Sequence, residues 1–224
     1  MPSKKPLLVL SDFDGTLSLT DVGYEVLLRF SGSGWDEIDR DYCEGRIGSR
    51  EAYGRICSIL GGTRDEMLRF VAENTVIDPH FEEFYAFCRR RDIDVKVVSD
   101  GLDFYIDFVL RRHGLCGIPF YSNVMTFEGD RPRSIEFPHG NETCSACGTC
   151  KSNILASCRG RYRTILYVGD GYSDLCPADK ADLVFAKGIL WTRLAAKERA
   201  GVRKYRSFRD VMEFLSNNGV NERG

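Results

Sequence analysis

Two aspartates stand two residues apart near the start of the chain, on either side of Phe13. The first of them ends residues 6–12, an apolar run that closes in an acid, as a buried parallel strand does. At the end of a strand, this spacing points the carboxylates of Asp12 and Asp14 the same way and turns Phe13 toward the core. Like charges so close together need a cation or a shared proton, and a hard cation such as Mg²⁺ suits carboxylate oxygens.

Such a pair could carry out phosphoryl transfer. One carboxylate can attack phosphorus to form an aspartyl phosphate, while the second protonates the leaving oxygen and later activates water. Gly15 and Thr16 follow directly; the glycine allows a sharp turn, and its amide could face a phosphate. Two acids alone would favour an acidic loop that caps a helix, so the catalytic interpretation depends on what lies downstream.

Polar clusters also follow two later apolar runs. A Ser-Asp-Gly sequence at 99–101 follows the strand-like run 95–98, and Asp170 follows the run 164–168. Ligands of open parallel sheets bind beyond the carboxyl ends of the strands. We therefore expect these clusters to meet the first pair of aspartates, where the Ser99 hydroxyl and the amides at the next helix start would favour an anion.

Two further residues fit the same site. Lys151 opens a helix expected at 151–158, where the helix dipole disfavours a cation, so its position favours a functional role over a solvated surface lysine. Asp174, four residues after Asp170, fits either a metal site or the first turn of the following helix.

Strands alternate with helices along most of the chain, which predicts an α/β fold with a doubly wound, mostly parallel sheet. Glycines separate three helix-like pieces at 35–75, so we expect a helical cap inserted after the first strand. The expected divisions are 1–17 and 78–216 for the core, 18–77 for the cap and 217–224 for a mobile tail. Other helices are expected at 21–30, 78–91, 102–112 and 207–217, strands at 120–122 and 183–186, and a hairpin at 124–137.

In their order along the chain, these motifs resemble the four signatures of the haloacid dehalogenase superfamily, whose phosphatases use an aspartate nucleophile. The run 12–16 resembles the first signature, Ser99 the second, Lys151 the third and the run 169–174 the fourth. The resemblance spans residues 10–187 and implies a Rossmann-like core, a Mg²⁺ cofactor and a phosphomonoester substrate.

The resemblance also implies a role for each residue. Asp12 would be the nucleophile and a metal ligand, and Asp14 would be the general acid and base and lend its carbonyl to the metal. Asp170 would bind the metal, with Asp174 a direct or indirect partner, and Lys151 would neutralise nucleophile and phosphate. The residues expected to bind the substrate and its phosphate are Gly15, Thr16, Asp21, Ser99, Asp100, Gly101 and Lys151.

The cap would lie over the strand ends as a lid, which excludes water and favours small phosphorylated metabolites. Its placement resembles the phosphoserine-phosphatase-like branch of the superfamily, with Asp21 where those enzymes carry a substrate-binding glutamate. At the position of the arginine that grips the serine carboxylate, ungapped counting gives Ile56, with Arg55 beside it. This departure makes phosphoserine a minor alternative.

A cysteine-rich segment before Lys151 is similar to another subgroup. His139, Cys144, Cys147 and Cys150 resemble a pattern of the methionine-salvage phosphatases, which act on 2-hydroxy-3-keto-5-methylthiopentenyl 1-phosphate. The same four residues could form a Cys₃His zinc site. Reduced thiols and a redox-sensitive loop are the alternatives.

The composition limits the partners. The 224 residues include 31 Lys and Arg against 33 Asp and Glu, a net charge of -2, so neither nucleic acid nor an anionic membrane is an expected partner. We expect no export signal and no spanning segment, and the odd number of cysteines, 9, argues against a disulfide framework. A cytoplasmic location is therefore expected, and the resemblance alone suggests a homodimer.

Together these patterns predict a Mg²⁺-dependent phosphatase of a small metabolite that works through a phospho-Asp12 intermediate, with the methionine-salvage compound as the candidate substrate. Three alternatives stay open: a phosphatase of phosphoserine or another small phosphomonoester, a phosphotransferase or mutase on the same core, and a non-catalytic metal or redox module built on the cysteine cluster. The intact acidic motifs argue against the last.

Overall fold

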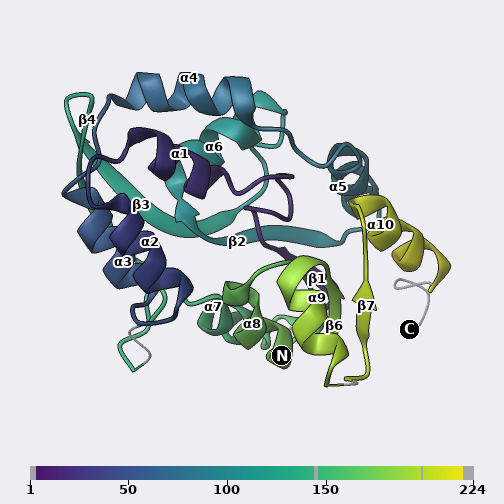
Figure 1. The fold of residues 1–224 in the computed structure, drawn as a ribbon. Coiled ribbons are helices and arrows are strands. Elements are labelled where there is room, and N and C mark those ends of the chain that lie inside the picture. The colour runs from purple at the N-terminus through teal and green to yellow at the C-terminus, as the bar shows by residue number, and fades with distance from the viewer. Residues whose placement is uncertain (1–3, 144–145, 198, 219–224) are drawn as a thin grey trace.

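The computed structural model describes residues 4–143, 146–197 and 199–218 (Figure 1). Within these ranges one sheet has the strand order β4-β3-β2-β1-β5-β6-β7. β4 runs antiparallel to β3, and the other neighbouring pairs are parallel. The doubly wound, mostly parallel α/β fold is thereby confirmed. The strands are β1 (Lys5–Ser11), β2 (Asp94–Leu102), β3 (Phe120–Glu128), β4 (Arg131–Glu136), β5 (Tyr162–Gly169), β6 (Leu183–Ala186) and β7 (Val202–Lys204).

Side-chain caps mark the starts of two helices, at 22 and 64. The Asp21 carboxylate accepts a hydrogen bond from the amide of Tyr24, and Thr63 and Glu66 form a reciprocal capping box. The helices are α1 (Val22–Phe30), α2 (Trp35–Cys43), α3 (Ser49–Cys57), α4 (Arg64–Asn74), α5 (Phe81–Arg90), α6 (Asp103–Arg112), α7 (Lys151–Cys158), the 3₁₀ turn η1 (Tyr172–Asp174), α8 (Leu175–Lys180), α9 (Gly188–Ala195) and α10 (Phe208–Asn217).

Helices cover both faces of the sheet. α5, α6 and α10 lie on one face, and α7, α8 and α9 lie on the other (Figure 1). Strand β1 contributes to the core on both faces of the sheet. Leu7 and Val9 pack in the cluster under α5, α6 and α10, while Leu8 and Leu10 pack in the cluster under α7, α8 and α9. All four side chains are fully buried. This explains why β1 is a continuous apolar run instead of an alternating one.

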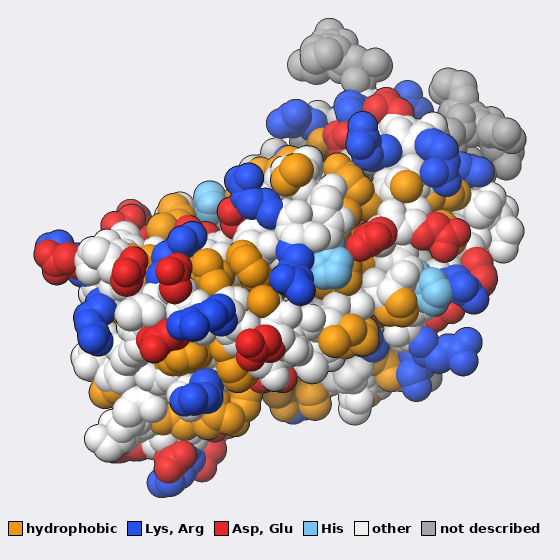
Figure 2. Space-filling model, turned by 90° about the horizontal axis from the view of Figure 1, so that it is seen from above, with side chains coloured by type: hydrophobic (Ala, Val, Ile, Leu, Met, Phe, Trp, Pro, Cys, Tyr) orange, Lys and Arg blue, Asp and Glu red, His pale blue; other side chains and the backbone are white. Residues whose placement is uncertain are grey.

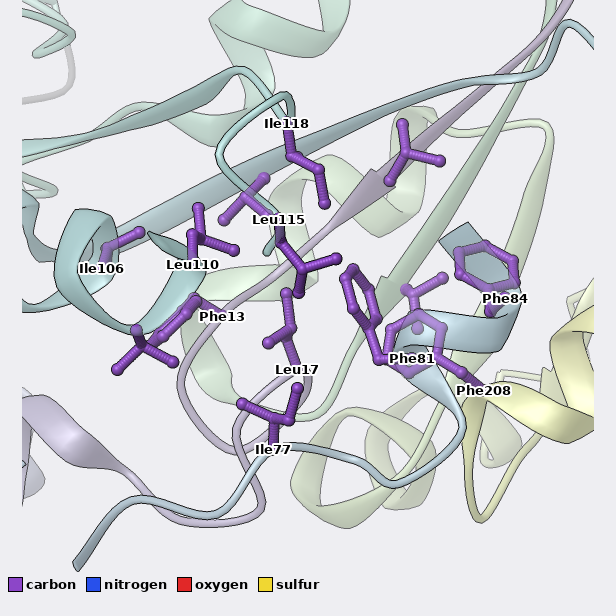
Figure 3. Packing of buried hydrophobic residues seen from close by; sticks show 14 of the residues in the cluster. Phe13, Leu17, Ile77, Phe81, Phe84, Ile106, Leu110, Leu115, Ile118 and Phe208 are labelled. Carbon is purple, nitrogen blue, oxygen red and sulfur yellow. The ribbon is translucent and has the colours of Figure 1, made fainter. Parts of the chain in front are cut away.

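Phe13 turns into the core directly after β1, as its place between two aspartates predicts. It is fully buried and packs in the same cluster as Leu17, Ile106 and Leu110 (Figure 3). Burying a phenylalanine side chain stabilises a fold by roughly 1.5–3 kcal/mol. The packing of this ring therefore fixes the backbone on which Asp12 and Asp14 point away from the core.

The structure differs from the expected elements in two places. The strand expected at 120–122 and the first arm of the hairpin are one continuous strand, β3, and the chain turns at Gly129, whose φ is +60°. Helix α9 and strand β7 were not expected. β7 has only three residues, none of them buried, and α9 has no side-chain cap at its start, so neither has a strong sequence signal.

Residues 18–77, which we name the helical insert, lie between β1 and α5 and contain α1 to α4. The chain leaves and returns at adjacent positions, because Ser18 and Ile77 form an antiparallel bridge. A small cluster of its own lies between its helices, made of Leu27, Trp35, Ile38, Ala52 and Ile56. No strand of the sheet lies between β1 and β2 in the described chain, as the glycine-separated helical pattern predicts.

The surface agrees with the balanced composition. On the face that Figure 2 shows, acidic and basic side chains are interspersed and form no broad patch of one sign. Among the described residues, no helix is both long and apolar enough to cross a membrane. Residues 219–224 of the expected tail lie outside the described chain.

Asp78 ties the end of the helical insert to the C-terminal helix, which leads to a prediction about stability. Its carboxylate is 1% exposed and accepts hydrogen bonds from the amides of His80 (2.9 Å) and Phe208 (3.1 Å). Replacement by alanine leaves two inward-facing amides without an acceptor. We expect Asp78→Ala to lower the free energy of unfolding by about 2–4 kcal/mol in urea titrations.

Asp78→Asn keeps one acceptor oxygen and should fall between the wild type and Asp78→Ala. The control is Asp107→Ala, which removes a partly exposed carboxylate that pairs with Arg111 one helical turn away. Its unfolding midpoint should stay close to that of the wild type. Equal midpoints for Asp78→Ala and Asp107→Ala would contradict the role of Asp78.

Candidate active site

The carboxyl ends of three parallel strands meet at one edge of the sheet. Ser11, the last residue of β1, lies level with Val97 of β2 and Val168 of β5. Asp12 and Asp170 directly follow β1 and β5 and so share this edge. The predicted convergence of the polar clusters is thus a consequence of strand register.

Lys151 lies buried between two carboxylates. Its Nζ is 2.7 Å from Asp12 Oδ2 and 2.7 Å from Asp174 Oδ1, and it donates a hydrogen bond to Ser173 Oγ at 2.9 Å. Burial alone would lower the pKa of this ammonium, but the charges of Asp12 and Asp174 outweigh burial and raise the pKa. The lysine therefore stays charged and compensates the carboxylates, which a desolvated site requires.

Asp174 acts as a brace, since protein donors take up both of its oxygens. Oδ1 also accepts from the Tyr167 hydroxyl (2.6 Å), and Oδ2 accepts from the amides of Asp170 (2.9 Å) and Gly171 (3.0 Å). Burial opposes ionisation, but Lys151 and these donors outweigh it and lower the pKa of Asp174. A single carboxylate thus fixes both the turn that carries Asp170 and the head of Lys151.

Gly15 and Thr16 both pack against the carboxylate of Asp170. Thr16 Oγ1 donates to Asp170 Oδ1 at 2.6 Å. Gly15 has a φ of +68°, and a Cβ there would lie 2.4 Å from Asp170 Oδ2, so the position requires glycine on both counts. Its amide donates to the carbonyl of Thr20 at 3.1 Å, which differs from the expectation that this amide faces a phosphate.

Asp14 occupies a separate polar niche beside Asp12. Its carboxylate accepts hydrogen bonds from the Tyr105 hydroxyl (2.7 Å), the Gly23 amide (3.2 Å) and the Ser99 hydroxyl (3.4 Å). Burial, reinforced by the charge of Asp21, raises the pKa of Asp14 to about 7, although the Tyr105 and Gly23 donors partly offset the rise. A carboxyl with this pKa can both give and take a proton near neutral pH.

Three carboxylates at this edge could hold a divalent cation. Asp12, Asp170 and Asp174 each offer an oxygen, and these oxygens lie within 4.8 Å of one another. Burial raises the pKa of Asp12, with a further contribution from the charge of Asp174, and burial raises the pKa of Asp170 to about 6. These buried carboxylates are costly to ionise without a cation beside them, and they offer only oxygen ligands. Both properties fit a hard cation such as Mg²⁺. Because Asp174 is fully engaged, Asp12 and Asp170 are the candidates for direct contact.

The expected phosphate-binding sequence 99–101 lies at the end of β2. The buried Ser99 hydroxyl accepts a hydrogen bond from the Gly101 amide at 2.9 Å. Ser99 lies within the strand and is not the cap of α6, whose N-cap is Leu102. The two oxygens of Asp100 accept hydrogen bonds from the Ser49 hydroxyl and the Thr149 amide.

A cavity of 540 Å³ opens over these residues, between the sheet edge and the helical insert. It reaches from the carboxylates to Asp21, which lines it while also capping α1. Its outer part is largely aromatic and aliphatic, lined by Tyr24, Leu27, Trp35, Ile38, Tyr53 and Ile56. Of the described residues that line it, Lys151 is the single lysine or arginine.

Arg55 does not serve the cavity. It pairs with Asp41 (3.0 Å) and Glu51 (2.5 Å) on the exposed side of the helical insert, whereas Ile56 lines the cavity and is 4% exposed. Arg55, the neighbour of Ile56, therefore supplies no guanidinium for a substrate carboxylate in the cavity.

The cysteine–histidine cluster falls partly outside the described residues, because Cys144 is among those left out. Among the residues that are described, His139, Cys147 and Cys150 belong to no group of metal ligands. The Cys150 thiol accepts a weak hydrogen bond from the side-chain amide of Asn141, and the backbone amide of Cys150 donates to the His139 carbonyl. The structure gives zinc no support.

The sequence alone did not point to several of the supporting residues. Tyr105 and Tyr167 reach Asp14 and Asp174 through their hydroxyls, yet each looks like an ordinary core aromatic in its own helix or strand. Both side chains are fully buried. A fully buried tyrosine hydroxyl needs a hydrogen-bond partner, but the sequence does not show which residue that partner is.

The carboxylate cluster predicts that a divalent cation stabilises the fold. Binding to the native state adds about 2.7 kcal/mol to the unfolding free energy at a free Mg²⁺ concentration of 100 Kd. We expect urea unfolding of the wild type to shift in this way, and the shift to shrink strongly in Asp170→Asn, which keeps the Thr16 contact but loses the charge.

The matched control is Asp179→Asn on the exposed side of α8, where the carboxylate pairs with Lys197. It should respond to Mg²⁺ as the wild type does. A Mg²⁺-dependent shift of the same size in Asp170→Asn would show that the cation binds elsewhere.

Known proteins resemble this chain over nearly its whole length. The 2-hydroxy-3-keto-5-methylthiopentenyl-1-phosphate phosphatase of Brevibacillus brevis is 28% identical over 94% of this chain and 96% of its own. That of Geobacillus kaustophilus is 30% identical over 83% and 85%. Among solved structures, a phospho-aspartyl intermediate analogue of phosphoserine phosphatase has a TM-score of 0.70 at 21% identity, covering 95% of this chain and 99% of that one.

A haloacid dehalogenase family hydrolase, t0658 of Salmonella enterica serovar Typhi, superposes with a TM-score of 0.75 at 18% identity, over 97% of this chain and 73% of its own. The phosphoserine phosphatase and the Salmonella hydrolase share the fold of this chain. The sequence model of the family described as "Putative Phosphatase" matches residues 7–217, a range that holds every carboxylate of the site. The chain belongs to this family of phosphatases, built on the haloacid dehalogenase fold.

Proposed function

We propose that this phosphatase hydrolyses 2-hydroxy-3-keto-5-methylthiopentenyl 1-phosphate, or a close phosphomonoester with an uncharged tail, through a phospho-Asp12 intermediate with Mg²⁺ as cofactor. The observation that carries the proposal is the cavity itself. Its inner end gathers Asp12, Asp14 and Lys151, and its outer part is aromatic and aliphatic. The relatives in Brevibacillus and Geobacillus, whose names give this substrate, support the choice.

Asp12 is the proposed nucleophile. A carboxylate oxygen of Asp12 attacks phosphorus, a new P–O bond forms to the protein, and the bond from phosphorus to the substrate oxygen breaks. Lys151 already lies 2.7 Å from Asp12, so it is placed to balance charge as it builds on the transferring group. Because the lysine is buried, this compensation is stronger than a solvated side chain could supply.

Asp14 is the proposed general acid and base. It gives its proton to the leaving oxygen in the first step and takes one from water in the second, when the water oxygen attacks phosphorus and the bond to Asp12 breaks. The pKa of about 7 suits both directions. Tyr105 and the Gly23 amide hold the carboxyl in place through both steps.

Asp12 and Asp170, together with the Asp14 carbonyl, are the proposed ligands of Mg²⁺, with Asp174 as the brace behind them. When bound, Mg²⁺ supplies positive charge that neutralises the carboxylates and polarises the phosphoryl oxygens. The helical insert is proposed as the lid that keeps bulk water out while the acyl phosphate exists.

The charges that line the cavity disfavour a substrate carboxylate. Asp21, Asp39 and Asp100 line it, and Lys151, which is committed to Asp12 and Asp174, is the single basic side chain among its described lining residues. A carboxylate buried there would be unpaired, at a cost of several kcal/mol. An apolar thioether tail, in contrast, gains from the aromatic lining.

The nucleophile assignment predicts the effect of Asp12→Asn. The variant keeps the shape and the contact with the Phe13 amide but cannot attack phosphorus. We expect Mg²⁺-dependent phosphate release from p-nitrophenyl phosphate to fall at least about 10³-fold, with an unchanged circular dichroism spectrum. Asp179→Asn is the control and should retain full activity. Retained activity in folded Asp12→Asn would refute the assignment.

The charge of the cavity predicts a preference between two matched substrates. O-phosphoethanolamine is O-phosphoserine without its carboxylate, so their ratio isolates the effect of that group. We expect kcat/KM to be lower for O-phosphoserine by at least about 100-fold, and highest for the methylthio-ketopentenyl phosphate. Comparable values for the matched pair would mean that the cavity accepts a carboxylate and would reopen phosphoserine as the substrate.

A further inference from the structure

Asp100 stands at the centre of a hydrogen-bonded cluster that none of the assigned roles uses. Its Oδ1 accepts from the Thr149 amide at 2.8 Å and from Asn123 Nδ2 at 3.1 Å, and its Oδ2 accepts from Ser49 Oγ at 2.5 Å. Asn123 Nδ2 also donates to the Asp100 carbonyl at 2.6 Å, and Thr149 Oγ1 donates to Asn123 Oδ1 at 3.0 Å.

The cluster is built from inward-facing side chains. Ser49, Asn123 and Thr149 are 8%, 0% and 1% exposed. Burial raises the pKa of Asp100, while Ser49, Thr149 and Asn123 favour its charged form. With donors on both oxygens, the Asp100 carboxylate is directed at protein groups and has little capacity left for a ligand in the cavity.

One side of the cluster belongs to the helical insert. Ser49 is the first residue of α3, and its hydroxyl also accepts from the Gly148 amide at 3.1 Å. Gly48 lies so close to the opposite loop that a Cβ on it would stand 2.0 Å from the Ala146 carbonyl oxygen. The start of α3 therefore packs directly against the backbone of the loop that precedes α7.

The other side of the cluster leads to the catalytic lysine. Thr149 is two residues before Lys151, and the Lys151 amide donates to the Thr149 carbonyl at 3.1 Å. Because Thr149 is held by Asp100 at its amide and by Asn123 at its hydroxyl, the backbone that starts α7 has a fixed position. That position sets where the Lys151 side chain begins.

We propose that Asp100 is a positioning residue: it clamps Ser49 of the helical insert and Thr149 of the Lys151 loop together, and thereby sets Lys151 between Asp12 and Asp174. The inference rests on the role of Lys151 in the proposed phosphoryl transfer. It assigns Asp100 neither to the phosphate nor to the substrate tail, although Asp100 lines the cavity.

The test is whether the effect of Asp100 passes through Lys151. We expect Ser49→Ala and Asp100→Ala each to lower kcat/KM for p-nitrophenyl phosphate by about 10- to 100-fold, since a displacement of about 1 Å can cost that much. In a Lys151→Ala background, neither substitution should lower it further, because residues that act as one unit are not additive.

A second readout does not need turnover. Calorimetric titration with inorganic phosphate in the presence of Mg²⁺ should show weaker binding in Ser49→Ala and Asp100→Ala than in the wild type. The difference should disappear when Lys151→Ala alone is compared with the double variants that combine it with Ser49→Ala or Asp100→Ala. Asp100→Asn keeps an oxygen for the Thr149 amide and gains an amide that can donate to Ser49 Oγ, so it should recover most of the loss.

Ser58→Ala is the control for the helical insert. Its hydroxyl donates to the Arg55 carbonyl on the exposed surface, away from the cavity lining, and its removal should change neither readout. The proposal is overturned if Asp100→Ala costs the same factor in the presence and in the absence of Lys151. It is also overturned if the folded variant keeps its full kcat/KM and loses only thermal stability.

The failure of this proposal can be told apart from the failure of the proposed function. If the wild type releases no phosphate with Mg²⁺, the phosphoryl-transfer assignment itself is wrong. If the wild type is active and the Asp100 and Ser49 variants behave like Ser58→Ala, only the positioning role is wrong.

Discussion

The contact of one buried ammonium with two buried carboxylates is the constraint on which the rest of the site depends. Lys151 is 3% exposed, and Asp12 and Asp174 are 5% and 0% exposed, so none of the three charges is appreciably solvated. Taking isolated charges out of water costs several kcal/mol each. The pairing makes their burial tolerable, and the nearby Asp170 leaves the edge with more negative than positive charge. That excess is what attracts a cation. The pKa of Asp14 has a different cause: burial, reinforced by the charge of Asp21, raises it to about 7.

The strands of the sheet position these charged side chains through their register. Register places the ends of β1 and β5 side by side, and the buried ring of Phe13 fixes the turn after β1. Each functional carboxylate is then held by a neighbour of a different element: Asp14 by Tyr105 of α6, Asp170 by Thr16, and Asp174 by Tyr167 of β5. Holding reactive groups on rigid elements in this way limits the reorganisation that the reaction itself would otherwise require.

The sequence predicted the parts of this arrangement that short-range patterns encode. The apolar run before Asp12 and the glycine-separated helices of the insert each have a local pattern, and both were found as expected. The strand predicted at 95–98 was also found, but it continues through Ser99 to Leu102. What the sequence could not give are contacts between distant segments, such as Tyr105 with Asp14 or Ser49 with Asp100, because nothing local distinguishes those side chains. β7 was missed since three residues without a buried member carry no pattern, and the Gly15 amide was misplaced because its acceptor, Thr20, lies in a turn that no period predicts.

The hydrogen bonds of Asp78 have a consequence for how the chain matures on the ribosome. Asp78 stands where the insert rejoins the core, and one of its two amide donors belongs to Phe208, 130 residues later. Domains form as their segments emerge during synthesis. Until the segment around residue 208 has left the exit tunnel, this carboxylate has only the local amide of His80 as a donor, and the junction of the insert stays incompletely fixed. Nascent chains that end before Phe208 therefore lack the completed junction between the insert and the core.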